Sequence, residues 1–83
     1  MHSTIARAWE AFLSAVAEAQ HLHRSGGAAE AIQDLLQHAR ELLEIIDDEI
    51  ALHGLSVPKW ARDGFEHLRA RLTAVESSLI TRH

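Results

Sequence analysis

The sequence predicts an all-α protein, an up-down-up three-helix bundle with heptad-spaced seams that associates into a larger helical bundle as a homodimer. The 83 residues include 14 Ala and 11 Leu but only four Gly and one Pro, a composition that favours helices. Apolar residues recur at alternating steps of four and three, in three runs separated by glycines. A chain of this length is expected to form a single domain over residues 1–83.

The first helix is expected over residues 4–24. Ser3 or Thr4 can cap its start, because their short side chains accept hydrogen bonds from the first backbone N–H groups. Gly26 and Gly27 end it, since glycine adopts the left-handed conformation of a helix C-terminus without a steric penalty. The face predicted to enter the core comprises Ile5, Trp9, Phe12, Val16, Ala19 and His23.

The second helix is expected over residues 28–53. Gly54 followed by Leu55 predicts a Schellman ending in which Leu55 makes an apolar contact. The seam of this helix has unbroken heptad spacing, which is typical of helices that pack side by side along their length. It comprises Ile32, Leu36, Ala39, Leu43, Ile46, Ile50 and His53.

The third helix is expected over residues 58–80, with Ser56 or Val57 as its cap. Pro58 suits the first turn because its φ is already helical. The seam continues with the same spacing through Ala61, Phe65, Leu68, Leu72, Val75 and Leu79. Short connections make neighbouring helices antiparallel, which predicts the up-down-up order.

Charge differs between the second and third helices. The second carries Glu30, Asp34, Glu41, Glu44, Asp47, Asp48 and Glu49 against a single Arg40. The third carries Lys59, Arg62, Arg69, Arg71 and Arg82 against Asp63, Glu66 and Glu76. An acidic helix beside a basic one is expected to gain modestly from their proximity.

Composition argues against several classes of function. A net charge of −4 is unlike that of proteins that bind nucleic acid directly, which gather Lys and Arg on one face. Charged residues interrupt every apolar stretch, so no membrane span is expected. The start of the chain does not have the pattern of a secretory signal, and there is no cysteine. We therefore expect a cytoplasmic protein without a membrane partner.

The second helix has more apolar residues than a monomer needs. Leu42 flanks its seam, and Ile45 and Leu52 lie further round, where they are expected to remain exposed. A row of exposed aliphatic side chains favours a partner, most often a second copy of the chain. The alternative is that the tilt of this long helix brings Ile45 and Leu52 into the core of the monomer.

A second candidate surface lies beside the seam of the third helix. Trp60, Gly64, His67, Arg71 and Ser78 share this flank. Gly64 can leave room for the ring of Trp60 or allow another helix to approach closely. Trp60 and Arg71 are residue types that anchor interfaces, although Trp60 can equally pack within its own bundle.

The seven histidines raise the question of a metal site. No two lie three or four residues apart, the spacings that place two imidazoles on one helix face. Glu49 with His53, and Asp63 with His67, can in principle meet as two histidines and two carboxylates, so a metal-binding helical protein remains an alternative. Ordinary surface contacts explain these pairs equally well. The favoured prediction has no metal and no cofactor, with His23 and His53 satisfied at helix ends.

The acidic run that includes Glu41, Glu44, Asp47, Asp48 and Glu49 is either a solvated helix face or a stripe that binds a basic partner. In the second case the protein is an inhibitor that mimics nucleic acid. No catalytic constellation is visible, so we expect a non-enzymatic module for protein–protein interaction, an adaptor, inhibitor or regulator. The residues predicted to contact its partner are Leu42, Ile45, Glu49, Leu52, Trp60, His67 and Arg71.

Overall fold

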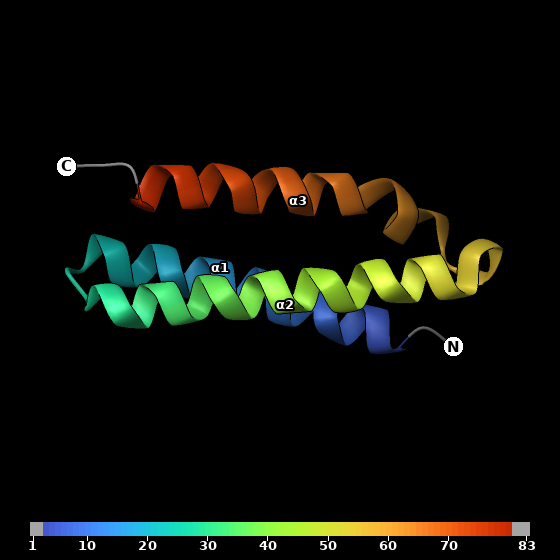
Figure 1. Ribbon diagram of the computed structural model, residues 1–83, viewed down its shortest axis with the longest axis horizontal. Coiled ribbons are helices and arrows are strands. Elements are labelled where there is room, and N and C mark those ends of the chain that lie inside the picture. Colours follow the sequence, from blue (N-terminus) through green and yellow to red (C-terminus); the bar gives the residue numbers. More distant parts are fainter. Residues whose placement is uncertain (1–2, 81–83) are drawn as a thin grey trace.

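The computed structural model describes residues 3–80, and these residues form three helices and one short 3-10 turn with no strand (Figure 1). The helices are α1 (Ser3–Arg24), α2 (Ala29–His53) and α3 (Lys59–Ile80), with the 3-10 turn η1 (Gly54–Ser56) between the last two. Each boundary lies within one residue of the sequence prediction. The all-α three-helix bundle is therefore confirmed.

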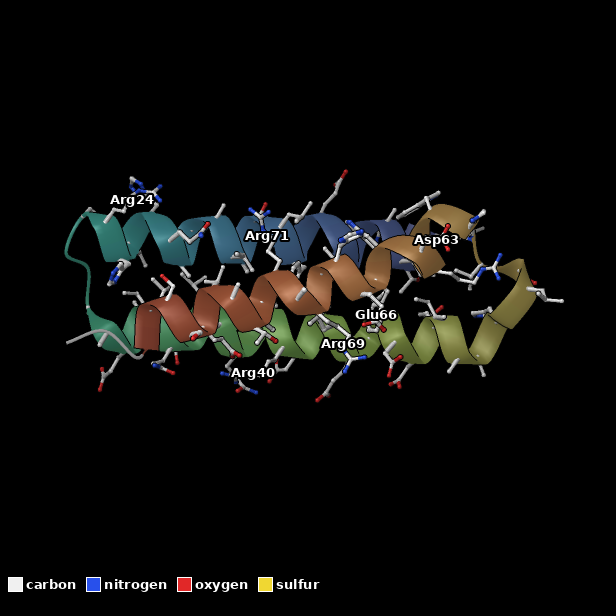
Figure 2. All side chains as sticks on the ribbon, turned by 90° about the horizontal axis from the view of Figure 1, so that it is seen from above. Arg24, Arg40, Asp63, Glu66, Arg69 and Arg71 are labelled. Atoms are coloured by element: carbon white, nitrogen blue, oxygen red, sulfur yellow. The ribbon has the colours of Figure 1, made fainter. Side chains whose placement is uncertain are left out.

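The helices form two layers. The antiparallel helices α1 and α2 contact each other most extensively and form one layer. Helix α3 forms the other layer, passing diagonally from above α1 at its start to above α2 at its end (Figures 1 and 2). The bundle measures 44 × 18 × 15 Å between Cα atoms. Only one side of the α1–α2 layer is covered by α3, so the opposite side faces outward along the lower edge of Figure 1.

The end of α1 is a Schellman motif. The N–H of Gly27 donates to the carbonyl oxygen of Leu22 at 2.7 Å, and the N–H of Gly26 donates to that of His23 at 3.3 Å. Gly26 has φ +79°, a left-handed conformation that glycine adopts without strain. The predicted stop is confirmed.

The predicted cap of α1 at Thr4 is wrong, because the helix already includes Ser3 and so contains Thr4 in its first turn. The cap itself lies outside the described residues. At the start of α2, Ala28 occupies the cap position with extended backbone, φ −64° and ψ 137°, and provides no side-chain hydrogen bond. Only its carbonyl takes part, accepting from the N–H of Ile32 at 3.2 Å. The first N–H groups of α2 therefore receive no help from a capping side chain.

The turn after α2 differs from the predicted Schellman ending. Gly54 has φ +50° and ψ −115°, and the chain continues into the 3-10 turn η1 instead of forming the hydrogen bonds of a Schellman motif. Leu55 consequently points outward and is 91% exposed, so its predicted apolar contact is wrong. The 3-10 turn brings Val57 inward in its place, where it packs with Ile5 and Ala61 at 2% exposure.

The core is entirely apolar among residues 4–79, with no buried polar side chain. Phe12, Val16, Leu36 and Ile46 are fully buried where the helices meet. The seam ends differ from the prediction, because His23 is only partly buried and His53 is exposed. Burial of apolar side chains is thus the main stabilising contribution that the described residues make to this fold.

Replacing Ala28 by serine tests the missing cap of α2. A serine hydroxyl in this extended position can accept a hydrogen bond from the second or third N–H of the helix. We expect Ala28→Ser to raise the free energy of unfolding by about 1 kcal/mol, measured by urea denaturation. Ala29→Ser, one residue inside the helix, is the matched control and is expected to give no gain. Equal effects of the two substitutions would contradict the capping explanation.

Candidate interaction surface

Six of the seven predicted contact residues fall on two separate flanks, and the seventh, Leu42, is buried. On α2, Arg40 lies about 100° to one side of Ala39 in helical projection and pairs with α3, whereas Ile45 and Leu52 lie about 120–140° to the other side. We call Ile45, Glu49 and Leu52 the α2 flank. Trp60, His67 and Arg71 form the α3 flank, on the side of α3 that faces α1. The structure therefore does not join the seven residues into one site.

Leu42, which was predicted to contact a partner, is buried in the monomer. It is 8% exposed and packs in the main core cluster. The reason is the close contact between α1 and α2, which covers the sector of α2 next to its seam. Leu43, a seam residue on the side of α3, remains partly exposed.

Ile45 and Leu52 are exposed in the monomer, at 43% and 76%. This exposure shows that the alternative in which the tilt of α2 brings them into the core is wrong. Between them, Glu49 is partly buried and its Oε1 lies 3.2 Å from Nε2 of His53. The α2 flank is thus an apolar pair separated by one heptad, with a carboxylate paired to a histidine between them.

Trp60 is both packed and exposed. Its ring meets Trp9 of α1 edge to face, with centroids 5.0 Å apart and planes at 74°, yet half of the residue (51%) remains open. Gly64 explains this geometry, because a Cβ there would lie 3.0 Å from Cζ2 of Trp9. The glycine thus lets α3 approach the Trp9 ring, which in turn supports Trp60. The sequence singled out Gly64 but did not indicate Trp9 as its neighbour.

His67 and Arg71 are exposed on the same flank, and Arg71 extends over α1 (Figure 2). Within the described part of the chain Arg71 has no ion pair. Trp60 and Arg71, about three turns apart along α3, are both of residue types that are enriched at binding surfaces.

The charge contact between α2 and α3 reverses the predicted pattern. Arg40, the one arginine of the acidic helix, places Nη2 2.6 Å from Oε2 of Glu76 on the basic helix, and its guanidinium also contacts Gln37. Lys59 and Arg69 instead pair within α3. Arg82, which was counted among the basic residues, lies outside the described residues. The opposite net charges of the two helices therefore do not produce the ion pair that joins them.

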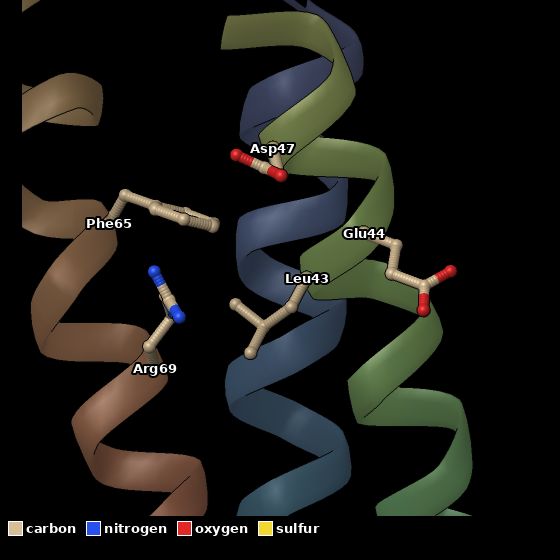
Figure 3. A pocket seen from close by; sticks show the side chains of 5 residues that line it. All are labelled: Leu43, Glu44, Asp47, Phe65 and Arg69. Atoms are coloured by element: carbon tan, nitrogen blue, oxygen red, sulfur yellow. The ribbon is translucent and has the colours of Figure 1, made fainter. Parts of the chain in front are cut away.

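A groove of about 210 Å³ lies between α2 and α3 (Figure 3). Leu43 and Phe65 form its apolar part, and Arg69 stands over the Phe65 ring at 5.8 Å from the centroid. Asp47 and Glu44 line the α2 side, although Glu44 turns away from the centre. The groove is smaller than the roughly 300–1,000 Å³ of ordinary small-molecule sites, so its size does not favour a ligand. Sequence reasoning missed it, because it depends on how α3 crosses α2.

The proposed meeting of two histidines and two carboxylates does not occur. Asp63 turns to Lys59, with Oδ2 2.5 Å from Nζ, and this hydrogen bond holds the pKa of the Asp63 carboxyl below its ordinary value. Glu49 contacts His53 in a separate pair. Among residues 3–80, no three His, Asp or Glu side chains lie close enough together to hold one metal ion.

Substitution of Gly64 tests the contact with Trp9. An interior helix glycine replaced by alanine ordinarily gains about 0.5–1 kcal/mol of stability. We expect Gly64→Ala to give no gain in the wild-type chain, because its methyl group meets the Trp9 ring, and to give the ordinary gain in a Trp9→Leu background. Urea denaturation of the four proteins measures the coupling between the two sites. The same gain in both backgrounds would contradict the contact.

Comparison with protein-family models, with curated proteins and with solved structures found no match to this chain. None of the helices within residues 3–80 is long and apolar enough to span a membrane. The function is therefore inferred from the two flanks themselves, from the residues that they expose and from the contacts that position them.

Proposed function

We propose that this protein is a small non-enzymatic module for protein–protein interaction, a homodimer that acts as an adaptor, inhibitor or regulator through exposed helix faces. The observation that carries the proposal is the exposure of large apolar side chains on the surface of the bundle, in addition to the apolar side chains that fill its described core. Ile45 and Leu52 are exposed on α2, and Trp60 on α3. The proposal places the protein in the cytoplasm, where a fold without disulfides is usual.

The exposed residues of α2 are regular in position. Scattered exposed aliphatic residues need no explanation, but Ile45 and Leu52 lie one heptad apart on one side of the helix. Removing them from water on binding stabilises a complex by roughly 25 cal/mol for each Å² of apolar surface covered. This spacing favours a helical partner that lies along α2.

The α3 flank supplies a second contact surface. Trp60 is held by Trp9 and so presents a ring whose position is already restricted, which lowers the entropic cost of binding. Arg71 adds a charge on the same side. In a homodimer formed through the α2 flank, both α3 flanks would remain open to another protein.

Capture from an extract of the native host tests the interaction function. Ile45→Glu places a charge on the α2 flank, and Trp60→Ala removes the ring of the α3 flank. We expect each variant to lose, by about tenfold or more, a defined set of proteins that the wild type retains, measured by quantitative mass spectrometry. Leu13→Glu is the matched control for Ile45→Glu, because Leu13 is 39% exposed and lies, by helical projection, on the Trp9 side of α1, away from the α2 flank. Identical retention by wild type and both variants would contradict the proposal.

The exposed carboxylates of α2 favour a second candidate, an acidic inhibitor that mimics nucleic acid to block a basic partner. Asp47 and Asp48 are exposed, and neither forms an ion pair within the described residues. Glu49 is different, since it already pairs with His53. Carboxylates with no partner of their own are available to basic side chains on another molecule.

A salt series separates this candidate from the first. If the acidic face binds, capture of basic proteins should weaken steeply between about 50 and 300 mM salt and should fall further in the Asp47→Asn, Asp48→Asn double variant. Glu49→Gln should have a smaller effect, because that carboxylate already has a partner in His53, 3.2 Å away. Capture that is insensitive to salt and unchanged in the double variant would eliminate the mimic.

A further inference from the structure

The outer side of α2 carries a second heptad seam. This second seam lies next to the core seam, and its residues follow one another at alternating steps of four and three. It comprises Ala31, Leu35, His38, Leu42, Ile45, Glu49 and Leu52. Every second member is exposed, namely Ala31, His38, Ile45 and Leu52, whereas Leu35 and Glu49 are partly buried and Leu42 is buried. One row of this seam therefore packs toward the core, and the other row lies on the open side of the helix.

A matching seam lies on the adjacent side of α1. It comprises Thr4, Ala8, Ala11, Ala15, Glu18 and Leu22. On α1 the contact with α3 lies at Trp9, on the other side of the core face, so this seam belongs to the side of the α1–α2 layer that α3 leaves uncovered. Ala8 and Ala15 are buried in the core, Ala11 and Leu22 are partly buried, and Thr4 and Glu18 are exposed. The outer members of the two seams form the surface against which another pair of helices can pack.

The two edges of this surface differ in charge. Along the α2 edge lie Asp34, Glu41 and Asp48, one heptad apart and all exposed. Along the α1 edge lie Arg7, Ser14 and His21, also one heptad apart and all exposed. Within the described residues, Arg7, Asp34 and Asp48 take part in no ion pair. Each edge is therefore available to a surface of opposite charge.

We propose that the occupant of this surface is a second copy of the chain, related by a two-fold axis parallel to the helices. The inference rests on the proposed interaction function and specifies its geometry. Such an axis keeps every residue at its own height and places α1 of each copy opposite α2 of the other, running antiparallel. The centre of the α1–α2 turn lies near residues 26–27. A residue of α1 therefore lies at the same height as the residue of α2, in its own copy or in the partner, for which the two residue numbers add to about 53.

Complementary side chains then meet. Arg7 lies within one turn of the partner's Asp48, and His21, whose imidazole N–H can donate a hydrogen bond, lies within one turn of the partner's Asp34. The polar residues of the seams also correspond, because Glu18 comes within one turn of the partner's His38. Each pair occurs twice in the dimer, as two-fold symmetry requires.

The other simple arrangement is disfavoured by charge. A two-fold axis perpendicular to the helices would place α2 against α2, with Asp34, Glu41 and Asp48 facing the same acidic edge. The surface also has the size that a dimer needs. It lies on a side of the bundle that measures 44 by 15 Å between Cα atoms, comparable with the roughly 800 Å² that each partner contributes to a stable interface.

Sedimentation equilibrium over a concentration series tests the dimer. The wild type should sediment as a dimer in the micromolar range, and Ile45→Glu should weaken association by about a hundredfold, since the charge enters both halves of the interface. Leu13→Glu should leave association unchanged. A wild type that remains a 9.2 kDa monomer at high micromolar concentration, or equal weakening by the two variants, overturns the inference.

Charge exchange tests the direction of the axis. Arg7→Glu alone and Asp48→Arg alone should each weaken the dimer by about tenfold, and the double variant should restore it, because the pair is re-formed with reversed sign. Additive weakening in the double variant overturns the parallel axis. If the chain stays monomeric but its capture of host proteins still depends on Ile45, the dimer is wrong and the interaction function is supported. If the chain neither dimerises nor captures host proteins, both proposals are wrong.

Discussion

The packing of α1 against α2 is the contact on which the rest of the bundle depends. These helices run antiparallel along their full length, and the Schellman turn at Gly26 holds them together at one end. Their close approach buries Leu42 and leaves the far sector of α2 uncovered. A third helix can cover only one side of a two-helix layer, so the opposite side of the α1–α2 layer is not covered by α3. The α2 flank follows from this geometry.

The position of α3 depends on a different kind of contact. Gly64 allows the Trp9 ring to lie against the helix, and Trp60 then packs edge to face on the same ring. At mid-helix, Arg40 and Glu76 join α2 to α3 through a short charged hydrogen bond. The partly exposed groove beside Phe65 shows that α3 packs less closely along α2 than α1 does. Thus α3 is anchored at particular points on a layer that is already formed.

In the proposed function the exposed apolar residues of this small bundle serve association, because they lie outside the core clusters of the monomer. A protein of this size buries a smaller share of its surface than a larger one, and association is a common way to add to its stability. Binding would cover Ile45 and Leu52, and the acidic edge beside them would select a partner surface of opposite charge. In this proposal, stability and function arise from the same surface.

The sequence by itself determined the three helices, the glycines at which the first two end, and the position of Ile45 and Leu52 away from the seam of the second. Those features depend on local conformational preference and on the angular position of each residue around its own helix, which spacing specifies directly. Spacing does not say how closely neighbouring helices approach. The burial of Leu42 and the outward turn of Leu55 were decided only in the tertiary structure, because each depends on where another helix crosses. The same holds for the meeting of Trp9 with Gly64, since side chains from separate helices come together only once the packing angle between those helices is set.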